Sequence, residues 1–135
     1  MQNTIQDVKF QNEFYAQQCK MVKEIFVTND WYKEILKYRL FQLKFTNNFE
    51  IDNEENQLEI ERVEKQIQGE GTLIKLILSL MSPENAWLIE KCYLDPETKN
   101  GKGWYLDYFS KTTFYKRKKQ AITEFLNFYF THVHE

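Results

Sequence analysis

The sequence predicts an all-α fold, with long N-terminal helices followed by a C-terminal helix-turn-helix. Two observations predict this class. The 135 residues include only four glycines and two prolines, so few residues break a helix. Apolar side chains also recur at steps of three, four and seven, and no segment alternates as a half-buried strand does. A chain of this length can bury a core without disulfides.

The first predicted helix begins near residue 5 and ends near residue 27. Polar residues at 28–30 (Thr, Asn, Asp) supply a cap, and we expect a break there before a second helix. The apolar stripe of the first helix is made of Ile5, Val8, Tyr15, Cys19, Val22 and Phe26.

The second predicted helix has two apolar stripes. One contains Leu36, Leu40 and Leu43, and the other lies on a different face. A helix that is apolar on two sides is buried on more than one side, either in the core or in a dimer. The second stripe is made of Trp31, Ile35, Tyr38, Phe45 and Phe49.

The middle of the chain is acidic. Residues 47–53 form a predicted connection, and 54–68 form a charged helix. Residues 50–70 carry eight carboxylates against two bases, Arg62 and Lys65. Two glycines then interrupt the pattern, and 73–81 is a short apolar helix.

The last third contains two helix starts. Ser82 followed by Pro83 predicts a helix start, because proline suits the first helical position. We expect this helix to end near Asp95. Residues 95–103 form a loop, 104–109 a short apolar element, and Ser110 caps a final helix that extends to about residue 130.

The final helix combines a basic first half with an apolar second half. Residues 111–119 hold five bases and no acid, although the whole chain has a net charge of −2. Cations are disfavoured at a helix N-terminus, so this placement points to an external anion such as a phosphate. We expect an apolar side that packs inward and contains Phe114, Ala121, Ile122, Phe125 and Tyr129. A solvated helix face without a ligand is the alternative interpretation.

Two segments carry a resemblance to a known family: Leu80 to Leu94 (LMSPENAWLIEKCYL) and Trp104 to Ile122 (WYLDYFSKTTFYKRKKQAI). Together they resemble the C-terminal helix-turn-helix of sigma factors (a sigma region 4-like module). They resemble more closely the ArpU-type phage and autolysin transcriptional regulators and related small mollicute proteins. The resemblance covers about residues 72–130. The turn before the cap has Tyr108 where that pattern has a glycine.

The resemblance implies contacts to double-stranded DNA from the first half of the final helix. Threonines suit base edges or phosphates, and lysines suit phosphates. Arg117 is a candidate because of its side-chain chemistry and not because of the resemblance: a guanidinium can hold a phosphate with two hydrogen bonds. The candidate DNA-binding residues are Lys111, Thr112, Thr113, Tyr115, Lys116, Arg117 and Lys119.

Other chemistries lack a motif. We expect no enzyme, no cofactor and no metal site, because no glycine-rich phosphate loop or nucleophile–base pair occurs, and His132 and His134 form a frayed tail. Cys19 and Cys92 are expected to be reduced core thiols. The three tryptophans (Trp31, Trp87, Trp104) are expected in the core. No segment is expected to span a membrane or to act as a leader, which favours a cytoplasmic protein.

The expected function is therefore a DNA-binding transcriptional regulator that acts as a homodimer. Residues 1–50 would form the helical dimerisation region, 51–71 an acidic connecting helix, and 72–135 the DNA-binding domain. Two alternatives stay open. One is a sigma-like accessory factor that binds RNA polymerase. The other is a helical interaction module with no nucleic-acid role, in which the acidic helix of 50–70 would cover Lys116 and Lys119.

Overall fold

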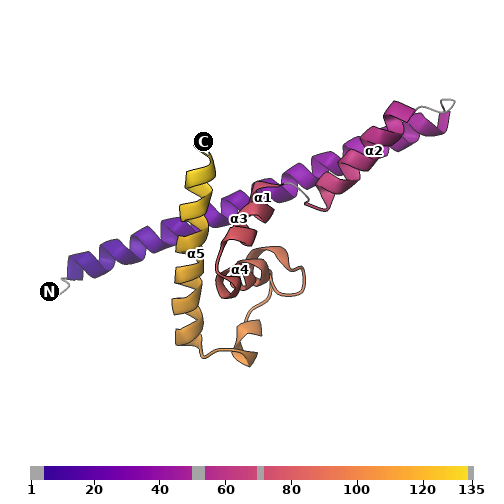
Figure 1. The fold of residues 1–135 in the computed structure, drawn as a ribbon. Helices are drawn as coiled ribbons and strands as arrows, with labels where there is room; N and C mark the ends of the chain where they lie inside the picture. The colour runs from indigo at the N-terminus through magenta and orange to yellow at the C-terminus, as the bar shows by residue number, and fades with distance from the viewer. Residues whose placement is uncertain (1–4, 50–53, 70–71, 134–135) are drawn as a thin grey trace. The chain divides into compact units, whose positions relative to one another are not determined.

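The fold is all-α, as the sequence predicts. The computed structural model describes residues 5–49, 54–69 and 72–133, and these contain helices, turns and loops but no strand. They form two compact units (Figure 1), and we describe each by itself. The core unit contains residues 1–26 and 77–135, and the hairpin unit contains residues 27–76.

Helix α1 (Ile5–Phe49) is continuous, so the predicted break at residues 28–30 is wrong. Threonine, asparagine and aspartate each cost only a few tenths of a kcal/mol inside a helix, roughly 0.7 at most. Phe26, just before this polar segment, and Leu36, just after it, are both buried in their units. Packing on either side therefore holds the helix through three residues of low helix propensity.

The core unit is built around α4 (Pro83–Ile89) and α5 (Lys111–Val133), which pack directly against each other. The first part of α1 contributes Phe26, whose ring centre lies 5.1 Å from that of Tyr93 and 5.4 Å from that of Phe125. The largest fully buried side chains of this unit are Val22, Ile77, Leu88, Ile89, Ile122 and Phe125.

Helix α4 does not stop at Ile89 but widens into a π-helical segment, η1 (Glu90–Leu94). The N–H of Asp95 donates to the carbonyl of Glu90 at 2.8 Å, five residues back rather than four. The predicted end of this helix near Asp95 is confirmed. The loop that follows is held to η1, because the Thr98 hydroxyl donates to the Lys91 carbonyl at 2.6 Å.

The loop ends at Gly103, which has a φ of 83°. Most side chains avoid this left-handed region, so a glycine is suited to the position. A short 3₁₀ helix, η2 (Trp104–Asp107), follows at the predicted short apolar element. Ser110 then begins α5, where the sequence places its cap.

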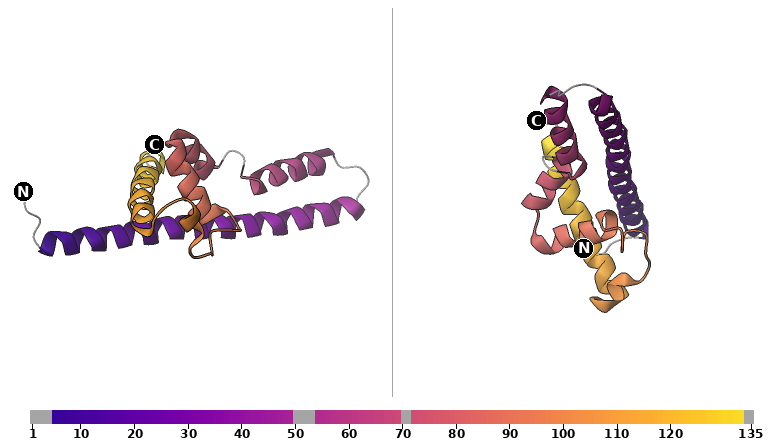
Figure 2. Two further views of the ribbon diagram at one scale, coloured as in Figure 1. Left: turned by 90° about the horizontal axis from the view of Figure 1, so that it is seen from below. Right: turned by 90° about the vertical axis from the view of Figure 1, so that its right-hand side faces the viewer.

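The hairpin unit consists mainly of the second part of α1 and helix α2 (Glu54–Ile67), which runs back beside it in Figures 1 and 2. Ile60 and Val63 of α2 and Leu36 of α1 are buried. Two ion pairs join the helices: Arg39 with Glu59 and Lys44 with Glu64. Helix α3 (Leu73–Leu80) begins after Gly69, whose φ is 85°.

Candidate nucleic-acid interface

The start of α5 is capped as the sequence predicts. The Oγ of Ser110 accepts a hydrogen bond from the N–H of Thr113 at 3.2 Å, and the two side-chain oxygens lie 3.0 Å apart. This satisfies one of the free N–H groups of the first turn. The cap adds no negative charge, so Lys111 in the first turn remains at the end of the helix where the dipole is positive, and the other four bases follow in the next turns.

The inward side of α5 is held by apolar packing. Phe114 is buried, and its ring stacks on Tyr105 with the centres 3.9 Å apart. The Trp104 ring meets the Phe114 ring edge-on, with the ring centres 5.6 Å apart. Ala121, Ile122 and Phe125 are also buried, which confirms four of the five residues predicted on the inward side, and the fifth, Tyr129, is half-buried. The first turns of α5 are therefore fixed to η2, and the next turns to the core.

The opposite side of α5 carries three of the seven candidate residues. Thr112, Thr113 and Lys116 are all exposed. Lys119 is exposed as well, at the edge of this face, and its Nζ lies 5.9 Å from the centre of the Tyr15 ring in α1. We call these four residues the outer face of α5. No acidic residue occurs between 111 and 123, and the first carboxylate of α5 is that of Glu124.

The remaining three candidates point elsewhere. Lys111 and Tyr115 line one hollow of the core unit, and Arg117 lines another. The seven residues predicted as one contact set are thus divided among three surfaces. This follows from helix geometry, because a run of nine consecutive residues covers every side of a helix.

The first hollow is basic. It has a volume of about 420 Å³ and lies between the 95–103 loop, η2 and the first half of α5. Four of the twelve lining residues are lysines and none is acidic. These lysines are Lys99, Lys102, Lys111 and Lys118.

Sequence reasoning missed three of these lysines. Lys118 is half-buried, with its Nζ 5.9 Å from the centre of the Tyr93 ring. Lys99 and Lys102 belong to the loop before η2. The basic composition of Lys-Asn-Gly-Lys-Gly, residues 99–103, is the signal that marks these lysines as candidates, although it does not predict that they lie beside Lys111.

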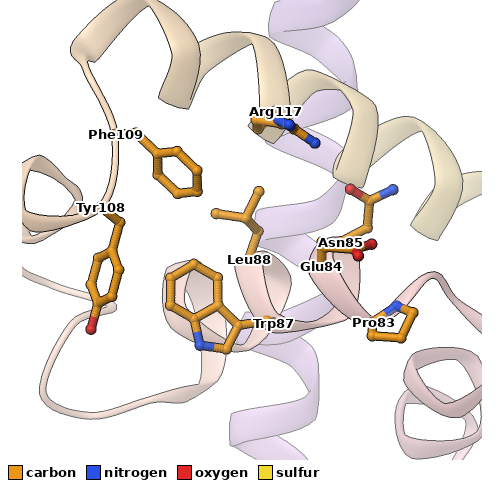
Figure 3. Close-up of a pocket in the computed structure, with 8 residues that line it drawn as sticks. All are labelled: Pro83, Glu84, Asn85, Trp87, Leu88, Tyr108, Phe109 and Arg117. Carbon is orange, nitrogen blue, oxygen red and sulfur yellow. The ribbon is translucent and has the colours of Figure 1, made fainter.

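The second hollow is apolar and has a volume of about 500 Å³. Figure 3 shows Trp87 and Leu88 of α4 facing Tyr108 and Phe109, with Arg117 of α5 above them. Tyr108 and Phe109 meet the Trp87 ring edge-on. Tyr108, which replaces the expected glycine, is thus a wall of this hollow.

The connection between α4 and α5 is longer than in a compact helix-turn-helix. Residues 95–110 separate η1 from α5, and they include η2. In a compact helix-turn-helix the turn has three or four residues. The two helices still pack together, so the pair is held by side-chain packing rather than by the shortness of its turn.

Burial raises the pKa of three groups of the core unit near α5. Burial, together with nearby Cys19, raises the pKa of the Tyr15 hydroxyl, and burial likewise raises the pKa of Tyr93. Burial also raises the pKa of the Cys92 thiol, although Lys118 opposes this. These groups stay neutral at neutral pH, so they add no negative charge beside the lysines of α5.

Three further expectations have outcomes in the structure. Cys19 and Cys92 are free and half-buried. Trp87 and Trp104 are half-buried, but Trp31 is exposed, so its predicted place in the core is wrong. The predicted frayed tail is wrong for His132, which lies within α5, and His134 lies outside the described residues. Among those described, no group of three or more metal-binding side chains occurs, and no helix is long and apolar enough to cross a membrane.

No protein-family model matches the chain, and comparisons with curated proteins and with solved structures give no significant match. The function must therefore be argued from the residues.

Proposed function

We propose that the core unit binds double-stranded DNA through the first half of α5 and that the protein is a transcriptional regulator. The observation that carries this proposal is the outer face: Thr112, Thr113, Lys116 and Lys119 are exposed on a capped helix that has no acid before Glu124. The resemblance of residues 72–130 to ArpU-type regulators points to the same helix.

The chemistry of the outer face suits a duplex. Lysines neutralise backbone phosphates, and short hydroxyl side chains approach either phosphates or base edges closely. The positive end of the helix dipole adds to the attraction for an anion. Phe114 and Phe125 anchor the other side, so the helix can present this face without losing its packing.

The basic hollow extends the candidate surface beyond α5. Lys99 and Lys102 bring two more cations to the same end of the helix as Lys111. A DNA backbone that passes this end would meet charges from the loop and from the helix together. We therefore add Lys99 and Lys102 to the residues expected to contact phosphates.

The test is duplex binding measured as a function of salt concentration. We expect the wild type to bind a mixed duplex with a negative slope of log affinity against log salt. Lys111→Ala combined with Lys116→Ala removes two cations from the first two turns. Each lost phosphate contact should reduce the steepness of the slope by about 0.9. Circular dichroism checks that α5 still forms.

The matched control removes the same charge elsewhere. Lys23→Ala combined with Lys37→Ala takes two exposed lysines from α1 and should leave the slope unchanged. Equal slopes for wild type and the α5 variant, or no duplex binding at low salt, would contradict the proposal.

A second candidate function rests on the apolar hollow. Trp87, Tyr108 and Phe109 form an aromatic recess that suits a side chain of a protein partner, and Arg117 lies beside it. A sigma-like accessory factor would use such a surface to bind RNA polymerase. Co-purification with polymerase that Trp87→Ala abolishes, together with no affinity for free duplex, would favour this function over direct DNA binding.

A further inference from the structure

The second part of α1 has two apolar faces, and only one of them is covered. The covered face contains Leu36, which is 7% exposed, with Leu40 and Leu43 half-buried on the same side. The ion pairs of Arg39 and Lys44 with α2 flank this side. The hairpin unit therefore accounts for one of the two stripes that the sequence predicts.

The other face is strongly exposed. The exposed fractions are 68% for Trp31, 64% for Ile35, 72% for Tyr38 and 56% for Phe45. These positions follow steps of four, three and seven, and Gln42 lies between Tyr38 and Phe45 at the same register. Steps of this kind define the a and d positions of a coiled coil, with Ile35 and Gln42 at a. We call Trp31, Ile35, Tyr38, Gln42 and Phe45 the seam.

We infer that the seam pairs with the seam of a second copy of this chain, as a parallel two-stranded coiled coil. A twofold interface requires one patch that is complementary to itself, and a heptad seam has this property. A single polar residue at an a position can fix the register and the number of strands of a coiled coil. Gln42 is such a residue, and it lies one heptad after the apolar a residue Ile35.

Charge complementarity selects the parallel orientation. In a parallel pair, a g residue faces the e residue five positions later on the partner helix. Glu34 is at g and Arg39 is at e, so each chain offers an acid that faces a base of the other copy. Within one chain Glu34 pairs with Lys37 at 2.9 Å and Arg39 lies 3.7 Å from Glu59. Both side chains are more than half exposed, at 62% and 56%, so each can also reach a partner helix.

The size of the exposed face fits a dimer. Each aromatic side chain can bury roughly 150–250 Å². With Phe41 beside the seam, the exposed apolar area is on the order of 600 Å² per chain, or ~1,200 Å² for two, which is near the lower limit for a specific interface. Beside the seam, Phe41, Gln42 and Phe45 line a hollow of about 440 Å³ together with Leu43 of the covered face and Asn56 of α2. Such a hollow can receive side chains of the partner helix.

The first test is the mass of the full chain in solution, measured by sedimentation velocity over a range of concentrations. We expect the wild type to be a dimer. Ile35→Glu combined with Tyr38→Glu should shift the protein to monomer, with the dissociation constant of the dimer raised at least 100-fold. Lys37→Glu is the matched control, because it changes the net charge by the same two units on the same turn but off the seam. It also removes the Lys37–Glu34 ion pair within the helix, which does not contribute to the seam. It should stay dimeric. A monomeric wild type, or a dimer that the seam variant preserves, overturns the inference.

The second test fixes the orientation and does not depend on a disruptive variant. In a parallel in-register pair, residue 35 of one copy lies against residue 35 of the other. Ile35→Cys should therefore form a disulfide between two copies under mild oxidation, with the linked peptide identified by mass spectrometry. Phe41→Cys, off the a and d positions, is the control and should link much less. A dimer without the 35–35 link overturns the parallel register.

Discussion

The carboxylate of Glu124 in α5 accepts hydrogen bonds from both the backbone N–H and the hydroxyl of Ser82, the residue that precedes α4. The amide of Asn85 donates to the same carboxylate at 2.8 Å. Ser82 makes no side-chain cap for its own helix, so the acid from α5 satisfies the start of α4 instead. One residue of the candidate DNA-binding helix thus positions the other helix of the pair.

Replacing this carboxylate should loosen the α4–α5 pair. Glu124→Gln keeps the shape but loses the charge and one acceptor, so we expect a loss of about 1 kcal/mol in the free energy of unfolding. The value is modest because Glu124 is only partly buried. Urea denaturation measures it. Glu90→Gln, at an exposed carboxylate of η1, is the control and should change stability much less.

The same group should make stability depend on pH. Partial burial raises the pKa of Glu124, but the hydrogen bonds from Ser82 and Asn85 outweigh it and hold the pKa below its usual value. A carboxyl whose pKa is lower in the folded state stabilises the protein above the unfolded pKa of about 4.3. This contribution is lost as the pH falls through the folded pKa. The stability difference between wild type and Glu124→Gln should therefore be constant near neutral pH and shrink at acid pH. A difference that grows in acid would contradict the assignment.

Phe26 should be the most sensitive aromatic residue of α1. It is buried between Tyr93 and Phe125, so Phe26→Ala leaves a cavity where α1 meets η1 and α5. We expect a loss of about 3–5 kcal/mol. Phe14→Ala is the matched control, because Phe14 is exposed on the same helix. Thermal unfolding of both variants measures the contrast, and equal losses would rule out this packing.

Gly103 should be more sensitive to substitution than Gly101. The φ of 83° at Gly103 is unfavourable for any side chain, and we expect Gly103→Ala to cost roughly 1–2 kcal/mol. At Gly101 an added Cβ meets only ordinary contacts, at 3.5 Å from the Thr98 carbonyl oxygen. Gly101→Ala should therefore be nearly neutral. Chemical denaturation compares the two, and equal effects would show that the backbone at Gly103 is not the cause.

The helix pattern was predictable because apolar periodicity and capping residues are local features. Ser110 and Pro83 mark real helix starts, and Gly69 marks a real end. The break predicted at residues 28–30 is wrong, because threonine, asparagine and aspartate favour helix caps but also occur inside a helix whose neighbouring residues are buried. Two apolar stripes on the second part of α1 were visible in sequence, but which stripe α2 covers depends on tertiary structure.

The candidate site was only partly predictable. Charge density pointed to α5, yet sequence alone could not divide its bases among the outer face and the two hollows. That division depends on which side of α5 meets η2 and α4. Lys99 and Lys102 are brought to Lys111 by the path of the loop, which no local pattern encodes. Long-range hydrogen bonds such as those of Ser82 with Glu124 are equally invisible before the fold is known.

The π-helical segment η1 shows that the positions of Lys99 and Lys102 depend on the number of residues between α4 and the loop. Its hydrogen bond from Asp95 to Glu90 shows that the turn accommodates one residue more than an α-helix would. The wide turn absorbs this extra residue, whereas deleting a residue from the regular turns of α4 would rotate the loop exit by about 100°. Lys99 and Lys102 would then swing away from Lys111 with the composition of the loop unaltered. A single in-frame deletion could thus separate the lysines of the basic hollow more thoroughly than many substitutions.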